Sequence, residues 1–356
     1  MSFAFALLVV VSAAPSPDWK TLGLAPSLQR ALVKGDYGGT PGGFKAITLS
    51  HVADGCVWQA QRHPARLEAA RHCVALAHAR ALDLHAEFCP PTDGVRHHCA
   101  ADELVAKANP LSLSHWLLVL GDGDALGACP DVALHHALAA GLAAKSVADE
   151  YAHVPSYRNV ELRWPADQSA LLAGLHRADV AHGTSVLVEP LEHFTTFIET
   201  RGLHRSGLPV SEVTGKGPGA RFPRGCAQSF ISRYLAEVDA PRAAAWWKTY
   251  KKGFFVTLPL GVVGFREWPP GVDGASDTDS GPIVFGIGSE ASALAISGAK
   301  AQGDGVLAHQ LQRSADQVLS LGIGSAVAHQ AFAEAIAFEG TWHPVVGAQA
   351  SETSHR

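Results

Sequence analysis

Charged residues gather near three prolines that mark helix starts, where their side chains could perform acid/base chemistry. Asp167, Arg224 and Asp279 each lie within a few residues of such a proline. Two carboxyl groups can act as general acid and base when their surroundings separate their pKa values. The sequence therefore predicts Asp167, Asp279 and Arg224 as catalytic residues. The alternative is ordinary helix-start chemistry, in which an acid or an ion pair stabilises the first turn.

The same segments and the loops beside them carry side chains suited to binding a ligand. Aromatic rings alternating with charges are typical of sites that stack on a flat or cyclic molecule such as a sugar. The tryptophans could instead fill the core. The predicted substrate-binding residues are Trp164, Arg221, Asp277, Glu267, Trp268, Tyr157 and His115.

Other kinds of site have weaker support in the sequence. There are 19 histidines, but the groups at His51-Asp54-Cys56 and His97-His98-Cys99 match no usual metal-binding spacing. We therefore predict no metal site and no cofactor. The sequence has no Gly-x-Ser-x-Gly motif that joins a strand to a helix. Cys226 is a secondary candidate nucleophile, because a helix start would stabilise its thiolate.

These residues must be positioned by a repeated element. Prolines 165, 223 and 282 follow one another at intervals of 58 and 59 residues, and Pro110 precedes them as a weaker member. This period fits a helix, a turn and a returning helix. Helices opening near residues 44, 102, 165, 223, 281 and 325 predict an all-α (α/α)6 toroid with six inner and six outer helices. The alternative is an open helical solenoid.

Two helices and two loops in this scheme bear directly on the site. Apolar periodicity predicts one helix over residues 101–120 and another over 281–301. Long loops rich in glycine and proline cover residues 202–221 and 258–279. The second loop includes residues 262–268, which could form a short strand. Loops of this length are usually functional or disordered.

Composition limits the location and the partners of the chain. Of 356 residues, 47% are hydrophobic and 17% charged, and the net charge of −5 argues against nucleic-acid binding. An apolar run followed by small residues predicts a signal peptide over residues 1–14, too short for stable membrane insertion. We expect an exported protein, periplasmic or secreted, with one domain over residues 15–345 and a disordered tail over 346–356. Six cysteines permit disulfides, Cys89–Cys99 among them.

Residues 151–339 resemble the linalool dehydratase-isomerase-like group of (α/α)6 proteins. The resemblance rests on Trp-Pro-Ala-Asp-Gln at 164–168, Arg-x-Pro-Arg-Gly-Cys at 221–226 and Val-x-x-Phe-Arg-Glu at 262–267. It implies a polar pocket that performs acid/base chemistry on a terpene alcohol. Arg163 and Ala170 stand where that family has cysteines, so the terpenoid activity is not carried over. The toroid is equally similar to many carbohydrate-active enzymes.

The predicted function is therefore cofactor-independent acid/base chemistry, either hydrolysis or elimination, on a sugar-like or terpenoid substrate. The alternative is a non-catalytic toroid that binds a glycan or a protein partner. The sequence leaves the substrate and the oligomeric state open.

Overall fold

The computed structural model describes residues 19–92, 96–97, 99–320 and 330–347, which are mostly helical. The predicted signal peptide and residues 348–356 of the predicted tail lie outside these residues. The helices are α1 (Trp19–Leu22), α2 (Pro26–Lys34), α3 (Gly42–Arg62), α4 (Leu67–Leu84), α5 (Ala101–Lys107), α6 (Pro110–Ala125), α7 (Val132–Ala148), α8 (Pro165–His182), α9 (Val188–Phe197), α10 (Gly225–Val238), α11 (Ala240–Phe254), α12 (Ser289–Ala301), α13 (Gly305–Ser320) and α14 (Gln330–Trp342).

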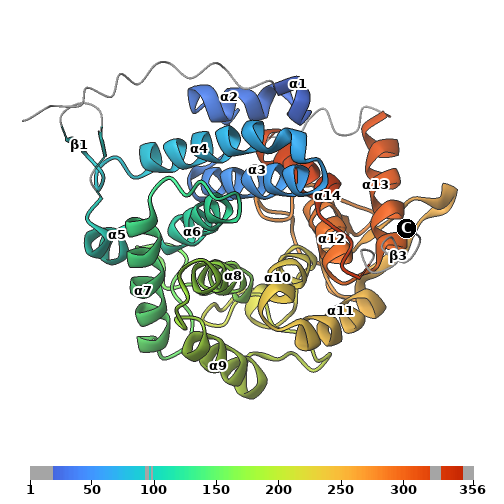
Figure 1. Ribbon diagram of the computed structural model, residues 1–356. Coiled ribbons are helices and arrows are strands. Elements are labelled where there is room, and N and C mark those ends of the chain that lie inside the picture. The colour runs from blue at the N-terminus through green and yellow to red at the C-terminus, as the bar shows by residue number, and fades with distance from the viewer. Residues whose placement is uncertain (1–18, 93–95, 98, 321–329, 348–356) are drawn as a thin grey trace, which may run out of the picture.

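Six of the helices in the described residues form a closed inner ring. Around the ring, α3 packs against α6, then come α8, α10, α12 and α14, and α14 packs back against α3. The helices α4, α7, α11, α13 and α2 pack on the ring from outside, and α9 packs on α7 (Figure 1). The contact between α14 and α3 confirms the predicted (α/α)6 toroid and rules out an open solenoid.

The distribution of apolar residues explains which helices lie inside. In α6, Leu117, Leu118, Val119 and Leu120 are consecutive and so point in different directions, yet all four are fully buried, as expected for a helix surrounded by protein. In α11 the buried residues Ala243, Trp246, Trp247, Tyr250 and Phe254 recur at helical spacing on one face. That helix therefore covers the ring with one face and meets solvent with the other.

The helix predicted over residues 101–120 is in fact two helices. Helix α5 ends at Lys107, Ala108 and Asn109 are extended, and the inner helix α6 begins at Pro110. A residue before proline is sterically excluded from the helical region, so the helix must stop and restart there. The inner helix thus begins at residue 110 rather than near 102.

The prediction of a helix over residues 281–301 was also wrong for residues 281–288. Strands β5 (Ile283–Val284) and β6 (Ile287–Gly288) form a hairpin, and α12 begins only at Ser289. Phe285 and Gly286 at the turn have φ angles of 52° and 79°, which a right-handed helix cannot accommodate. Apolar residues in this run therefore belong to a tight turn rather than to a buried helix.

Two further hairpins lie in the loops that connect helices, one between α4 and α5 and one between α11 and α12. Strands β3 (Phe255–Thr257) and β4 (Val263–Phe265) pair antiparallel, so the short strand predicted within residues 262–268 is present. Strands β1 (Pro91–Thr92) and β2 (Arg96–His97) pair in the loop closed by the Cys89–Cys99 disulfide, a bridge that the sequence predicted.

A second disulfide, Cys56–Cys73, joins α3 to α4. Throughout the described part of the chain, none of the helices has the length and apolar character needed to cross a membrane.

Candidate active site

The N-terminal ends of the inner helices surround a cavity of about 480 Å³. Gly42 and Gly43 of α3, Leu111 of α6, Ala166 of α8 and Cys226 of α10 all lie in its wall. The inner helices therefore run in the same direction, and their first turns meet at one end of the ring. A polar mouth on an apolar barrel is the usual form of a small-molecule site.

The structure brings five of the ten predicted site residues to this cavity. Asp167, Asp279, Arg224, Trp164 and Tyr157 line its wall. The remaining five, Arg221, Asp277, Glu267, Trp268 and His115, are not part of the wall. Of these, Asp277, Glu267 and Trp268 contact Arg224, so they hold a residue of the cavity wall in place.

Asp167 lies in the first turn of α8, two residues after the helix-starting Pro165. Burial, with a smaller contribution from the negative charge of Asp279 and against the opposing effect of Ser156, raises its pKa to about 7. In the described residues it forms no ion pair. At neutral pH a substantial fraction of Asp167 is therefore protonated and able to donate a proton.

Asp279 lies on the loop that precedes β5, at the exposed rim of the same cavity. The cavity walls desolvate its carboxyl group and raise its pKa to about 6, and the charge of Asp277 adds to this effect. The charge of Arg224 acts in the opposite direction. Asp279 is therefore mostly ionised at neutral pH and titrates below Asp167.

Arg224 is held by two carboxylates, the buried Glu267 and the more exposed Asp277. Its Nε donates to Oε1 of Glu267 at 2.8 Å, and its Nη2 donates to Oδ1 of Asp277 at 2.7 Å. Its guanidinium also lies 5.0 Å from the ring of Trp268. Burial favours the neutral form of Asp277, but the Arg224 hydrogen bond and charge keep the pKa of Asp277 below its usual value. Two carboxylates thus neutralise and orient one arginine.

The expectation that the helix start would favour a Cys226 thiolate fails for a local reason. Its backbone N–H donates to Oε2 of Glu267, and its Sγ lies 3.1 Å from Oε1 of that carboxylate. Burial and the charge of Glu267 raise the pKa of Cys226 well above its usual value, so the group is a thiol. It donates a hydrogen bond to Glu267 rather than acting as a nucleophile.

Aromatic rings form much of the remaining wall. Tyr157 and Trp164 meet edge to face with ring centroids 6.1 Å apart, and Phe44, Phe230 and Phe332 also line the cavity. Burial, followed by the charges of Asp167 and Asp279, raises the pKa of Tyr157, so its hydroxyl keeps its proton. The cavity combines apolar rings with two carboxyl groups and one cation.

His115, predicted as a substrate-binding residue, lies in the core of the ring and not in the cavity wall. It is fully buried in α6, and its Nδ1 lies 2.7 Å from Oγ of Ser50. Burial lowers its pKa well below the usual value, so the imidazole is neutral. Arg221 is exposed just ahead of α10.

A second cavity of about 570 Å³ lies at the C-terminal ends of the inner helices. A buried charge network borders it, and sequence reasoning missed that network. Arg233 on α10 binds Asp54 at 3.1 Å and Glu339 at 2.7 Å. Arg177 on α8 binds Asp54 at 2.7 Å and Asp122 at 2.9 Å. The sequence did contain an indication of this network, because arginines and acids occur within otherwise apolar inner helices.

Comparison with known proteins supports the architecture. No family model matches the sequence, and no curated protein matches it. Among solved structures, the chain is similar to an unsaturated glucuronyl hydrolase specific for heparin, with a TM-score of 0.59. The match covers 90% of this chain and 95% of that one at 11% sequence identity. At this identity the likeness shows the fold and leaves the reaction to be inferred from the site.

Proposed function

We propose that the chain is an enzyme that performs cofactor-independent acid/base chemistry, hydrolysis or elimination, in the cavity at the N-terminal ends of the inner helices. One observation carries the proposal. Two carboxyl groups with raised and different pKa values, Asp167 at about 7 and Asp279 at about 6, line the same cavity. Separated pKa values are the arrangement that lets one group donate a proton and the other accept one.

The roles follow from the order of titration. Asp167, with the higher pKa, protonates the leaving group, and Asp279 takes a proton from water or from substrate carbon. Arg224, held in place by Glu267 and Asp277, orients the substrate by donating hydrogen bonds to its oxygen atoms. Activity should be greatest between about pH 6 and 7, since it needs Asp279 ionised and Asp167 protonated.

A sugar-like substrate is the first choice. The cavity volume of about 480 Å³ is in the range of small-molecule sites, and its aromatic wall suits a sugar ring. The structurally similar protein is an unsaturated glucuronyl hydrolase specific for heparin. A terpenoid alcohol is the second class, from the resemblance of residues 151–339 to the linalool dehydratase-isomerase-like group. The two disulfides fit the expected export.

A non-catalytic glycan- or protein-binding toroid is the alternative. A binding module should hold its acids in ion pairs, as Asp277 is held by Arg224. Within the described residues neither Asp167 nor Asp279 has such a partner. This difference favours the enzyme.

The test is a substrate screen combined with matched variants. The full chain is incubated with unsaturated glucuronyl disaccharides, aryl glycosides and terpene alcohols, and products are identified by mass spectrometry. We expect one class to be converted, and Asp167→Asn and Asp279→Asn each to lower kcat by about 10²–10⁴-fold. Asp273→Asn, an exposed residue of the same loop outside the cavity, is the control and should retain full activity.

Two results would contradict the proposal. Full turnover by folded Asp167→Asn would remove the acid from the mechanism. Saturable glycan binding without conversion of any substrate class would support the binding module instead.

A further inference from the structure

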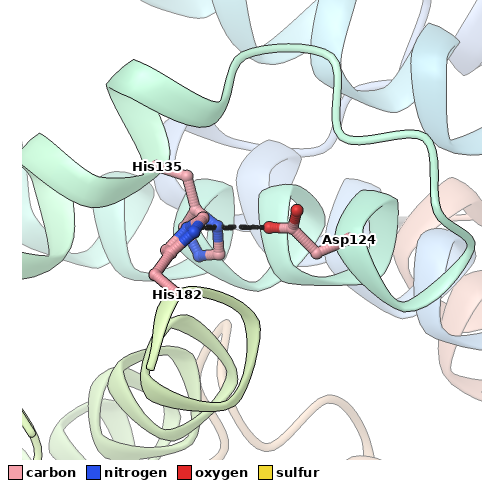
Figure 2. A group of neighbouring side chains, drawn as sticks. All are labelled: Asp124, His135 and His182. Carbon is pink, nitrogen blue, oxygen red and sulfur yellow. Dashed lines mark hydrogen bonds and ion pairs between the residues drawn. The ribbon is translucent and has the colours of Figure 1, made fainter. Parts of the chain in front are cut away.

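A second group of side chains, at the opposite end of the inner helices from the proposed catalytic residues, brings three metal-ligating atoms together. Asp124 is at the C-terminal end of α6, His135 is in α7, and His182 is the last residue of α8. One donor atom from each lies within 4.8 Å of the other two. Figure 2 shows the two imidazoles converging on the Asp124 carboxylate from three separate helices. We refer to these residues as the Asp-His-His cluster.

The distances inside this cluster match the spacing of ligands around a small metal ion. His135 Nδ1 lies 2.6 Å from Asp124 Oδ2, and His182 Nε2 lies 2.9 Å from His135 Nδ1 and 3.8 Å from Asp124 Oδ2. Ligands bound tetrahedrally to zinc at 2.0–2.1 Å are separated by about 3.3 Å. The three observed separations lie on both sides of that value, so an ion at the centre requires only small side-chain movements.

Hydrogen bonds among the three side chains cannot satisfy all of their converging nitrogen and oxygen atoms at once. Nδ1 of His135 contacts both the carboxylate and the second imidazole, yet a neutral ring nitrogen carries at most one proton. His135 is fully buried, and its Nε2 has no hydrogen-bond partner, so its polar contacts are all inside the cluster. One cation would satisfy all three converging lone pairs at once.

The surroundings also favour a cation. Asp124 and His182 stand at the C-terminal ends of α6 and α8, where helix dipoles place partial negative charge. The nearby Arg177 does not oppose this, because Asp54, Asp122 and Glu237 all bind its guanidinium. The local electrostatic field therefore does not repel a divalent ion.

We propose that the Asp-His-His cluster binds one divalent transition-metal ion, with zinc as the ion that best fits two imidazoles and one carboxylate. Such a site would tie the C-terminal ends of two inner helices to the outer helix α7. Imidazole nitrogens suit zinc, whereas magnesium and calcium prefer oxygen.

The experiment measures zinc binding directly. The full chain, freed of metal with a chelator, is titrated with zinc chloride by isothermal calorimetry, and bound metal is counted by mass spectrometry after dialysis. We expect one zinc per chain and an increase in Tm on zinc addition. His182→Gln and Asp124→Asn should weaken zinc binding by at least about 100-fold, since loss of an outer-sphere partner already costs 10–100-fold.

His193→Gln supplies the matched control. His193 and Glu189 form an exposed histidine–carboxylate pair at 3.9 Å on α9, outside the cluster. This variant should bind zinc as the unmodified chain does.

Failure of the unmodified chain to bind zinc saturably at micromolar concentration would overturn the proposal. So would undiminished binding by His182→Gln that circular dichroism shows to be folded. Neither readout uses enzymatic activity, so the proposal stands or falls independently of the catalytic assignment.

Discussion

At the start of α8, two opposed effects act on the Asp167 carboxyl group. The helix N-terminus favours the ionised form, because its unpaired N–H groups carry partial positive charge. Burial among the cavity walls favours the neutral form, and the resulting pKa of about 7 shows that burial is the stronger effect. An acid whose place in the sequence is typical of an ordinary first helical turn therefore stays partly protonated near neutral pH.

This shift has a consequence for stability. Because the folded state raises the pKa of Asp167 from 3.8 to about 7, it holds the proton more tightly than the unfolded state does. The stabilisation is complete below about pH 4 and is lost as pH rises through 7. Asp167→Asn cannot ionise, so it should exceed the unmodified chain in unfolding free energy by about 1–3 kcal/mol at pH 8 and match it near pH 4.

Urea unfolding at the two pH values measures this difference. Asp273→Asn, which replaces an exposed acid, should show no pH-dependent gain. An equal effect of Asp167→Asn at both pH values would mean that ionisation of this group is not what destabilises the fold.

At the scale of elements, the start of α10 depends on a close approach between two backbone segments. The N–H of Gly225 donates to the carbonyl oxygen of Glu267 at 2.7 Å. A Cβ atom at Gly225 would lie 2.0 Å from the carbonyl oxygen of Arg266, and this neighbour is backbone that cannot rotate away. The glycine therefore lets the 258–279 loop lie against α10 and carry Glu267 to Arg224.

Gly225→Ala should force the loop away from the helix start. We expect a loss of about 1–3 kcal/mol in the free energy of unfolding, as for other overpacked sites. Gly253→Ala in α11 is the matched control, since a Cβ there meets no atom within 4 Å. It should raise stability by a few tenths to about 1 kcal/mol. Equal effects of the two variants in urea unfolding would exclude a steric role for Gly225.

For the whole molecule, charged residues at the axis connect helices that are distant in sequence. Arg233 joins α10 to α3 through Asp54 and to α14 through Glu339. Burial alone favours a neutral Glu339, but His51 and Arg233 hold its pKa at about 2. Each of these carboxylates thus needs its cationic partner, because a buried and unpaired charge is costly.

Arg233→Met should therefore destabilise the toroid by about 3–5 kcal/mol, because it leaves Asp54 and Glu339 short of a partner in the interior. Lys107→Met, which removes the exposed pair with Glu103, should change stability by less than about 1 kcal/mol. Thermal and urea unfolding of both variants tests the difference. A similar small effect in both would show that the axial network adds little to the closed ring.

The positions at which some of the inner helices begin could be predicted from the sequence alone. The prolines at 110 and 165 do open inner helices, because a fixed φ and a missing N–H suit the first helical position. The same reasoning placed Asp167, Arg224 and Asp279 at one end of the ring. It failed at residues 281–288, since an apolar run of this length fits a buried helix and a tight hairpin equally well.

What only the tertiary structure decided is which side chains meet. Ring closure buries His115 beside Ser50, pairs Glu267 with Arg224, and brings Asp124, His135 and His182 together from three helices. No spacing along the chain encodes these contacts, because they depend on how helices many residues apart are rotated and packed. Burial then sets the pKa values, and burial is a property of the closed ring rather than of any segment.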